Sequence, residues 1–265
     1  MSDFGARGRQ GAGEGGGMSE PKNPVGDARR LARPELPRRF YKAARAGPAE
    51  GGFGLFLDGK LVRTPARRPL VVPWLRVAEA LAGEWDRQGE RIDPAEMPFT
   101  RIVNAAIDHV DQASDAVRAE VVKYAGSDLI CYRAEAPGSL VAAQLRAWNP
   151  LVAWALNELG APLDVATGIM HVTQPDVAIA AIAGAVAPFG GLALAALSTV
   201  ATVTGSAVVA LAVARGRLTA EEAWAAAIVD EEWQASQWGR DELAAAARAM
   251  RWREVEAAAL ILAAS

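Results

Sequence analysis

The side chains best suited to catalysis or metal binding are few in this sequence and do not form a recognisable site. Neither of the two histidines, His109 and His171, has a second histidine or a cysteine at the spacing of zinc ligands. The single cysteine, Cys131, stands in the half-apolar segment SDLICYRA, which is typical of a structural thiol. We therefore expect no metal site, and we expect both histidines to be surface or packed residues.

Motifs for nucleotide binding and nucleophilic catalysis are also missing from the sequence. There is no GxxxxGK[ST] loop, no GxSxG turn, no HExxH pair and no GxGxxG that follows a predicted strand. The segment TGS at 204–206 lies inside a long apolar run, where Gly205 would allow close helix packing. We expect no catalytic residue and no cofactor. The alternative is an enzyme of unknown reaction, with a cleft between a β domain and a helical domain.

The most unusual cluster is acidic and aromatic, in the segment AWAAAIVDEEWQASQWG. A continuous helix would place Glu231 in one row with apolar residues, namely Trp224, Ile228, Ala235 and Trp238. A carboxylate in such a row is either paired in the core or exposed for a partner, and the residues alone favour pairing. Trp85, which is flanked by Glu84 and Asp86, has the same two interpretations.

The chain divides by composition into three regions, and the structures they form would position these residues. Residues 1–36 are rich in Gly, Arg and Pro with few bulky apolar residues, which predicts a disordered basic tail. Residues 37–75 contain short β-type runs, and Asp58-Gly59 in LDGKL is typical of a two-residue hairpin turn. Residues 76–265 show helical periodicity. The expected fold class is α+β, with a small N-terminal antiparallel β domain followed by a larger helical domain.

Three helix boundaries near the C-terminus can be read from capping residues. Thr219 and Glu222 fit a capping box that opens a helix running to about Trp238, with Gly239 as its left-handed end. Asp241 then caps a final helix. The acidic and aromatic cluster would therefore lie on one helix just before the last one.

The apolar run from Leu192 to Ala214 is long enough to suggest a membrane span. Its composition argues against this, because residues 191–214 contain only nine Leu or Val among 24 residues. Pro188 and two glycines separate it from the apolar residues that precede it. We expect a buried pair of helices, one over residues 177–187 and one over residues 191–214, and no stable membrane insertion. A membrane-associated protein that uses this run is a further alternative.

The charges of the chain are unevenly distributed. Residues 1–46 hold ten Lys or Arg against five acidic residues, a net charge of +5. Because the whole chain has a net charge of −3, the remaining residues carry −8. An acidic body does not suit nucleic-acid binding but does suit a protein partner. The single cysteine fits a reducing compartment, so we expect the bacterial cytoplasm, or the mitochondrial matrix if the source is eukaryotic.

Eight segments, taken together and in order, resemble the assembly chaperones of the ATP synthase F1 alpha subunit, which occur in mitochondria and alphaproteobacteria. The resemblance extends from Arg39 to about Arg253, and the tail before residue 37 lies outside it. The segments are RFYK (39–42), LDGKLVRTPARRPL (57–70), EWDRQ (84–88), MPFTRIVNAAID (97–108), YAGSDLICYRA (124–134), QLRAWNPLVAWA (144–155), VTGSAVVALA (203–212) and DEEWQASQWG (230–239).

The resemblance implies a fold, a partner and a set of site residues. It implies a β-rich N-terminal domain followed by a helical orthogonal bundle, without catalytic activity or a nucleotide. It implies a protein, which we expect to be a monomer, that binds the unassembled F1 alpha subunit and prevents its aggregation until the beta subunit replaces it. The family's acidic position falls on Glu231, with Asp230 and Glu232 beside it as partner-binding residues. Three tryptophans are expected to be structural or partner-binding: Trp85, Trp233 and Trp238.

Overall fold

The computed structural model describes residues 36–168, 170–239 and 241–265. The predicted tail therefore lies outside the described residues, apart from its last position. Residues 37–265 form one compact unit, and its main buried cluster contains residues from both sides of position 75. The division into a β domain and a helical domain at that position stays a prediction, while the α+β fold class is confirmed.

The N-terminal sheet is built around its second strand. β2 (Gly52–Leu57) pairs antiparallel with β1 (Ala44–Ala49), β3 (Lys60–Leu61) and β4 (Val71–Val72). The predicted hairpin turn is confirmed, because Leu57 pairs with Lys60 and the two residues between them have φ values of 47° and 79°. Positive φ at both positions is the conformation that Asp-Gly turns favour.

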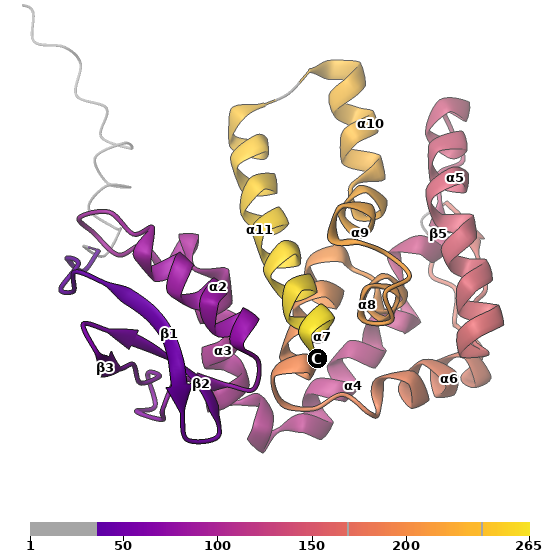
Figure 1. Ribbon diagram of the computed structural model, residues 1–265. Coiled ribbons are helices and arrows are strands. Elements are labelled where there is room, and N and C mark those ends of the chain that lie inside the picture. Colours follow the sequence, from indigo (N-terminus) through magenta and orange to yellow (C-terminus); the bar gives the residue numbers. More distant parts are fainter. Residues whose placement is uncertain (1–35, 169, 240) are drawn as a thin grey trace, which may run out of the picture. The chain divides into compact units, whose positions relative to one another are not determined.

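Ten α-helices make up most of the rest of the described chain, and α7 lies at their centre, in contact with α3, α4, α8 and α11. In Figure 1, α2 lies beside the indigo sheet, and yellow α11 runs down to the C-terminus beside α7. The helices are α2 (Leu75–Asp86), α3 (Pro98–Asp108), α4 (Ser114–Gly126), α5 (Gly138–Trp154), α6 (Asp176–Val186), α7 (Gly191–Thr204), α8 (Ala207–Ala214), α9 (Ala220–Ala227), α10 (Val229–Trp238) and α11 (Glu242–Ala264).

Short elements connect these helices. Two short strands, β5 (Tyr132–Arg133) and β6 (Ala166–Thr167), pair in parallel, so the expectation that the chain is entirely helical after residue 75 is wrong here. Two residues per strand are too few to show a period in the sequence. The remaining short elements are the 3₁₀ turns η1 (Pro94–Glu96), η2 (Val110–Gln112) and η3 (Leu129–Cys131), and a π-helical turn, η4 (Ala155–Leu159).

The expected separate helix over residues 177–187 is present as α6, but the run after it forms two buried helices, α7 and α8, where one helix over 191–214 was expected. Gly205, with a φ of 69°, ends α7 in the left-handed conformation, and the Ser206 hydroxyl caps α8 by accepting from the Val209 amide. A side chain at Gly205 would meet Leu129 only at an ordinary 3.8 Å. The glycine is therefore needed for its positive φ, and the expectation that it permits close packing is wrong. Within the described ranges, no helix is both long and apolar enough to cross a membrane.

The predicted helix from Thr219 to Trp238 is interrupted. The capping box of Thr219 and Glu222 is confirmed, but Ile228 adopts φ −108° and ψ 18°, which divides the segment into α9 and α10. The β-branched pair Ile228-Val229 has a lower helix propensity than the alanines before it. Gly239 ends α10 with a positive φ of 88° but a ψ of 175°, which is not the expected left-handed helical value. The cap of α11 by Asp241 is confirmed.

A fully buried carboxylate, Asp128, joins the corner between α7 and α8 to the turn η3. One oxygen accepts from the Ile130 amide at 3.2 Å, and the other accepts from the Val208 amide at 3.1 Å. Burial raises the pKa of Asp128 to about 6, although the Ser206 hydroxyl and the backbone amides favour the ionised form. Asp128 thus caps η3 and the first turn of α8 together.

This geometry predicts how stability depends on pH at Asp128. The pKa of Asp128 in the folded protein lies above the ordinary value of 3.8. The stability that this carboxyl contributes to the fold is therefore largest below about pH 4 and is lost as pH rises through 6. We expect the free energy of unfolding of the parent, relative to Asp128→Asn, to fall by about 2 to 3 kcal/mol across this window. Urea unfolding at a series of pH values measures it. If the free energy of unfolding changed with pH in the same way in both proteins, the raised pKa of Asp128 would be contradicted.

Candidate partner-binding site

The predicted acidic residues lie on α10, and each is bound by a different set of neighbours. Glu231 is paired with Arg251, whose Nη2 donates to the two carboxylate oxygens at 2.9 and 2.7 Å, while Arg248 Nε lies 3.5 Å away. The Glu231 side chain is 38% exposed. The carboxylate is therefore paired, but at the surface between α10 and α11 and not in the core.

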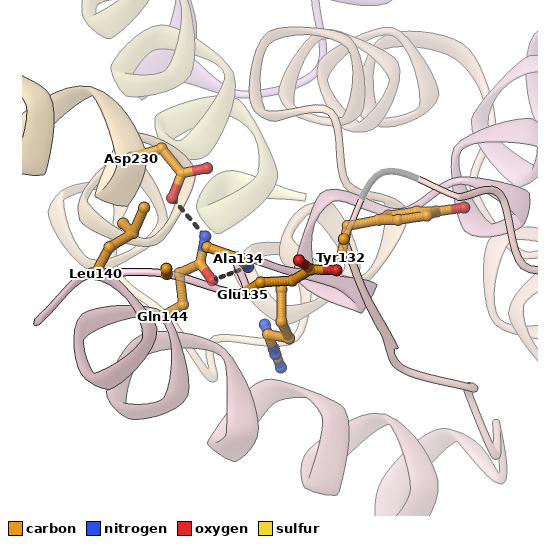
Figure 2. Close-up of a pocket in the computed structure, with 9 residues that line it drawn as sticks. Tyr132, Ala134, Glu135, Leu140, Gln144 and Asp230 are labelled. Carbon is orange, nitrogen blue, oxygen red and sulfur yellow. Dashed lines mark hydrogen bonds between the residues drawn. The ribbon is translucent and has the colours of Figure 1, made fainter. Parts of the chain in front are cut away.

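The two neighbouring acids connect α10 to other elements. Glu232 accepts a hydrogen bond from Arg248 of α11. Asp230 accepts from the Gln144 amide of α5 at 2.7 Å, and the Gln144 carbonyl accepts from the Ala134 backbone at 2.8 Å, as Figure 2 shows. The three consecutive acids therefore hold α10 between α5 on one side and α11 on the other.

An aromatic ring lies against one of the two arginine partners, Arg251. Arg251 lies over the ring of Trp224 at 5.5 Å, and Trp224 in turn contacts Trp252 with ring centroids 6.1 Å apart. The guanidinium group thus lies between a carboxylate and the face of an indole ring, and both interactions favour its charge. This places Arg251 and Glu231 in a defined geometry despite their partial exposure.

The two predicted tryptophans of α10 contact each other edge to face. The ring centroids of Trp233 and Trp238 are 5.7 Å apart at 89°, and Trp233 Nε1 donates to the Ser139 hydroxyl at 3.0 Å. Trp238 is 76% exposed. Beyond it, the first turns of α11 carry Leu243, which is 79% exposed, followed by four exposed alanines.

Hollows lie along α10 where it borders α5. One, of about 560 Å³, is bordered by the end of β5, Gln144 and Asp230, and is drawn in Figure 2. The other, of about 620 Å³, lies between α5 and the α9–α10 pair, and we call it the α5–α10 groove. Its lining is mostly apolar and consists of Ala143, Arg146, Ala147, Glu221, Trp224, Ala225, Ile228, Val229, Glu232 and Trp233.

Trp85 lies elsewhere, on α2, next to the sheet and α3. Its Nε1 donates to the Thr100 hydroxyl at 2.9 Å, and its ring contacts Tyr41 with centroids 5.5 Å apart. The adjacent Glu84 carboxylate is buried and accepts from the Phe99 and Thr100 amides, both at 2.8 Å. Burial raises the pKa of Glu84. These contacts give Trp85 a packing role at the start of α3; a partner contact stays a prediction.

The histidines and the cysteine do not converge on a site. His109 and His171 are exposed, and His171 Nδ1 lies 3.1 Å from the Tyr132 hydroxyl. Cys131 is buried, and burial raises the pKa of its thiol to about 12, as expected of a structural cysteine. Over residues 36–168, 170–239 and 241–265, no three potential metal ligands come together.

The two arginines that pair with the acidic residues were not apparent from the sequence. Arg248 and Arg251 are three residues apart, so their side chains share one face of α11, and this spacing was a usable signal. Nothing local, however, indicates that this face is opposite Glu231. Gln144 and Glu84 were also missed, because each bonds to a backbone segment outside its own helix. Gln144 accepts from Ala134, and Glu84 accepts from the start of α3.

This chain is similar to a known protein family and to solved structures. The ATP12 chaperone protein family matches residues 38–156. A candidate chaperone from Agrobacterium tumefaciens, Atu1473, is similar with a TM-score of 0.81 and 45% identity, over 94% of this chain and 93% of that one. Atp12 from Paracoccus denitrificans has a TM-score of 0.76 and 41% identity, over 86% of this chain and 97% of that one. A variant of the Paracoccus protein has the same TM-score and coverage, with 40% identity.

The ion pairs between α10 and α11 predict a measurable coupling. We expect Glu231→Lys and Arg251→Glu each to destabilise the fold modestly, because each places like charges together, and the double variant to recover part of that loss. Since both side chains are more than one third exposed, the coupling energy should be only about 0.5 to 1 kcal/mol. A double-mutant cycle by chemical denaturation measures it. Effects that add within about 0.3 kcal/mol would contradict the pairing.

Proposed function

The chain belongs to the ATP12 chaperone family, and on that premise we propose that it binds the unassembled F1 alpha subunit of ATP synthase. Binding would keep the alpha subunit from aggregating before it pairs with the beta subunit. The protein acts in this proposal as a monomer in the bacterial cytoplasm, without a cofactor and without catalytic chemistry. The eight matching segments and the similarity to Atp12 support the choice of partner.

The observation that carries the proposal is an exposed arm formed by α10 and residues 242–250 of α11. The arm extends away from α7 and α8 in Figure 1. Its exposed apolar residues include Trp238, Leu243 and Met250, whereas the second half of α11 buries Val255 and Ile261 in the core. An amphipathic helix normally buries its apolar residues against its own protein. Exposed apolar surface beside a set of charged residues is typical of a protein-binding face.

The proposed role has a simple physical basis. A subunit that lacks its neighbours exposes the apolar surface that the assembled complex would bury, and such surface self-associates. A chaperone needs only to cover that surface reversibly. The α10–α11 ion pairs are partly exposed and therefore weak, which suits a surface that binds and releases a partner.

The alternative of an enzyme has less support. A catalytic carboxyl with a raised pKa must be able to reach a substrate, but Asp128 is fully buried and engaged with backbone amides. The Cys131 thiol is likewise buried, and its high pKa makes it a poor nucleophile. The raised pKa values of these two groups are therefore accounted for by the packing of the fold.

The partner is tested with separated ATP synthase subunits. We expect the purified protein to suppress light scattering by the isolated alpha subunit at near-equimolar ratio and to be recovered with it in a pull-down. The isolated beta subunit, treated identically, is the control and should aggregate unchanged. Equal protection of both subunits would indicate a general holdase, and no binding to alpha would reject the proposal.

The acidic position is tested by Glu231→Lys. Because the Glu231 side chain is partly exposed, we expect the variant to lose less than about 1 to 2 kcal/mol of stability. Capture of the alpha subunit should fall by more than the fraction of protein that unfolds. Melting curves and pull-downs on the same preparations separate the two effects. A variant with parental capture would show that Glu231 has no part in binding.

A further inference from the structure

We propose that the α5–α10 groove binds a short apolar segment of the client protein that carries a lysine or arginine side chain. The proposal rests on the proposed function and names the part of the surface that holds the client and the chemistry of the segment it holds. The groove lies where α10 borders α5, whereas the ion pairs lie between α10 and α11.

The groove exists because α5 presents small side chains where α9 and α10 present large ones. Ala143 and Ala147 are four residues apart, so they lie on the same face of α5. Opposite them are Ile228 and Val229, at the break between the two helices. Because Ala143 and Ala147 contribute only methyl groups, a space of about 620 Å³ stays open beside them, which is room for a few apolar side chains.

Two tryptophans border this space and supply its anchoring surface. Trp224 and Trp233 are each only partly buried; Arg251 lies over the ring of Trp224, and Trp233 Nε1 donates to the Ser139 hydroxyl. A rigid aromatic side chain loses little conformational entropy when a partner packs against it, and such residues dominate the binding energy of many interfaces. The groove is therefore organised to bind apolar groups before any client arrives.

The charges along the groove select the kind of apolar segment. Glu221 and Glu232 line it, together with one basic residue, Arg146. Residues 220–238 of α9 and α10 include five acidic residues and no basic one, and arginines of α11 pair with two of the five, Glu231 and Glu232, so Glu221 is the lining acid that faces a client. The pKa of Glu221 is lowered by its own backbone amide and by the Thr219 hydroxyl, so its carboxylate stays ionised. An apolar segment with a cationic side chain is favoured here, and an acidic segment is opposed.

The test fills the groove without altering its charge. In Ala143→Trp the added indole occupies the space between α5 and α10, and we expect capture of the isolated F1 alpha subunit to fall at least about tenfold. Ala142→Trp is the matched control, because Ala142 is exposed on the same helix and does not line the groove. We expect it to retain capture. Melting curves establish that both variants are folded.

A second variant tests the charge selection and remains informative if Ala143→Trp does not fold. Glu221→Arg changes an exposed residue, and we expect it to weaken capture severalfold at low salt and less at high salt. If the parent binds the alpha subunit but Ala143→Trp binds equally well, the groove proposal is wrong and the proposed function stands. If Ala143→Trp does not fold, parental capture by Glu221→Arg overturns the groove proposal. If the parent does not bind the alpha subunit, the proposed function itself fails.

Discussion

The buried Asp128 carboxylate is the interaction on which the helical part of the molecule depends. It accepts from the amides of Ile130 and Val208, while the Gly205 carbonyl accepts from the Leu129 amide at 3.0 Å. The corner between α7 and α8 is thus bonded to η3 in both directions. A buried carboxylate without such donors would cost several kcal/mol, so this corner has one favourable arrangement. With α7 and α8 fixed, α3, α4 and α11 have a defined apolar surface on which to pack.

Different forces hold the body and the arm. The second half of α11 is attached to α7 by buried apolar residues, including Val255, Ile261 and Leu262. Within the arm, α10 is held by hydrogen bonds with α5 and by ion pairs with α11. Apolar packing keeps the body rigid, whereas partly exposed polar contacts contribute little stability and can be exchanged. A chaperone that must release its client benefits from this division.

Glu231 shows why pairing and partner binding need not exclude each other. A carboxylate in an apolar helix row was expected either to be paired in the core or to face a partner. The helix break at Ile228 turns α10 so that Glu231 is paired and also 38% exposed. Its charge is balanced by Arg251, so a basic client side chain would compete with an arginine that already occupies the site. In the proposed function, such competition would make client binding reversible and selective for the sign of the charge.

The sequence by itself determined the features that depend on neighbouring residues. The Asp58-Gly59 turn, the caps at Thr219 and Asp241, and the break at Pro188 between α6 and α7 follow from local conformational preferences, and all are present. Only the tertiary structure decided which distant side chains meet. Arg251 reaches Glu231 across 20 residues, and Gln144 reaches Asp230 across 86. Periodicity identifies the face of a helix that is apolar, but the packing of the helices against one another determines which residues lie opposite it.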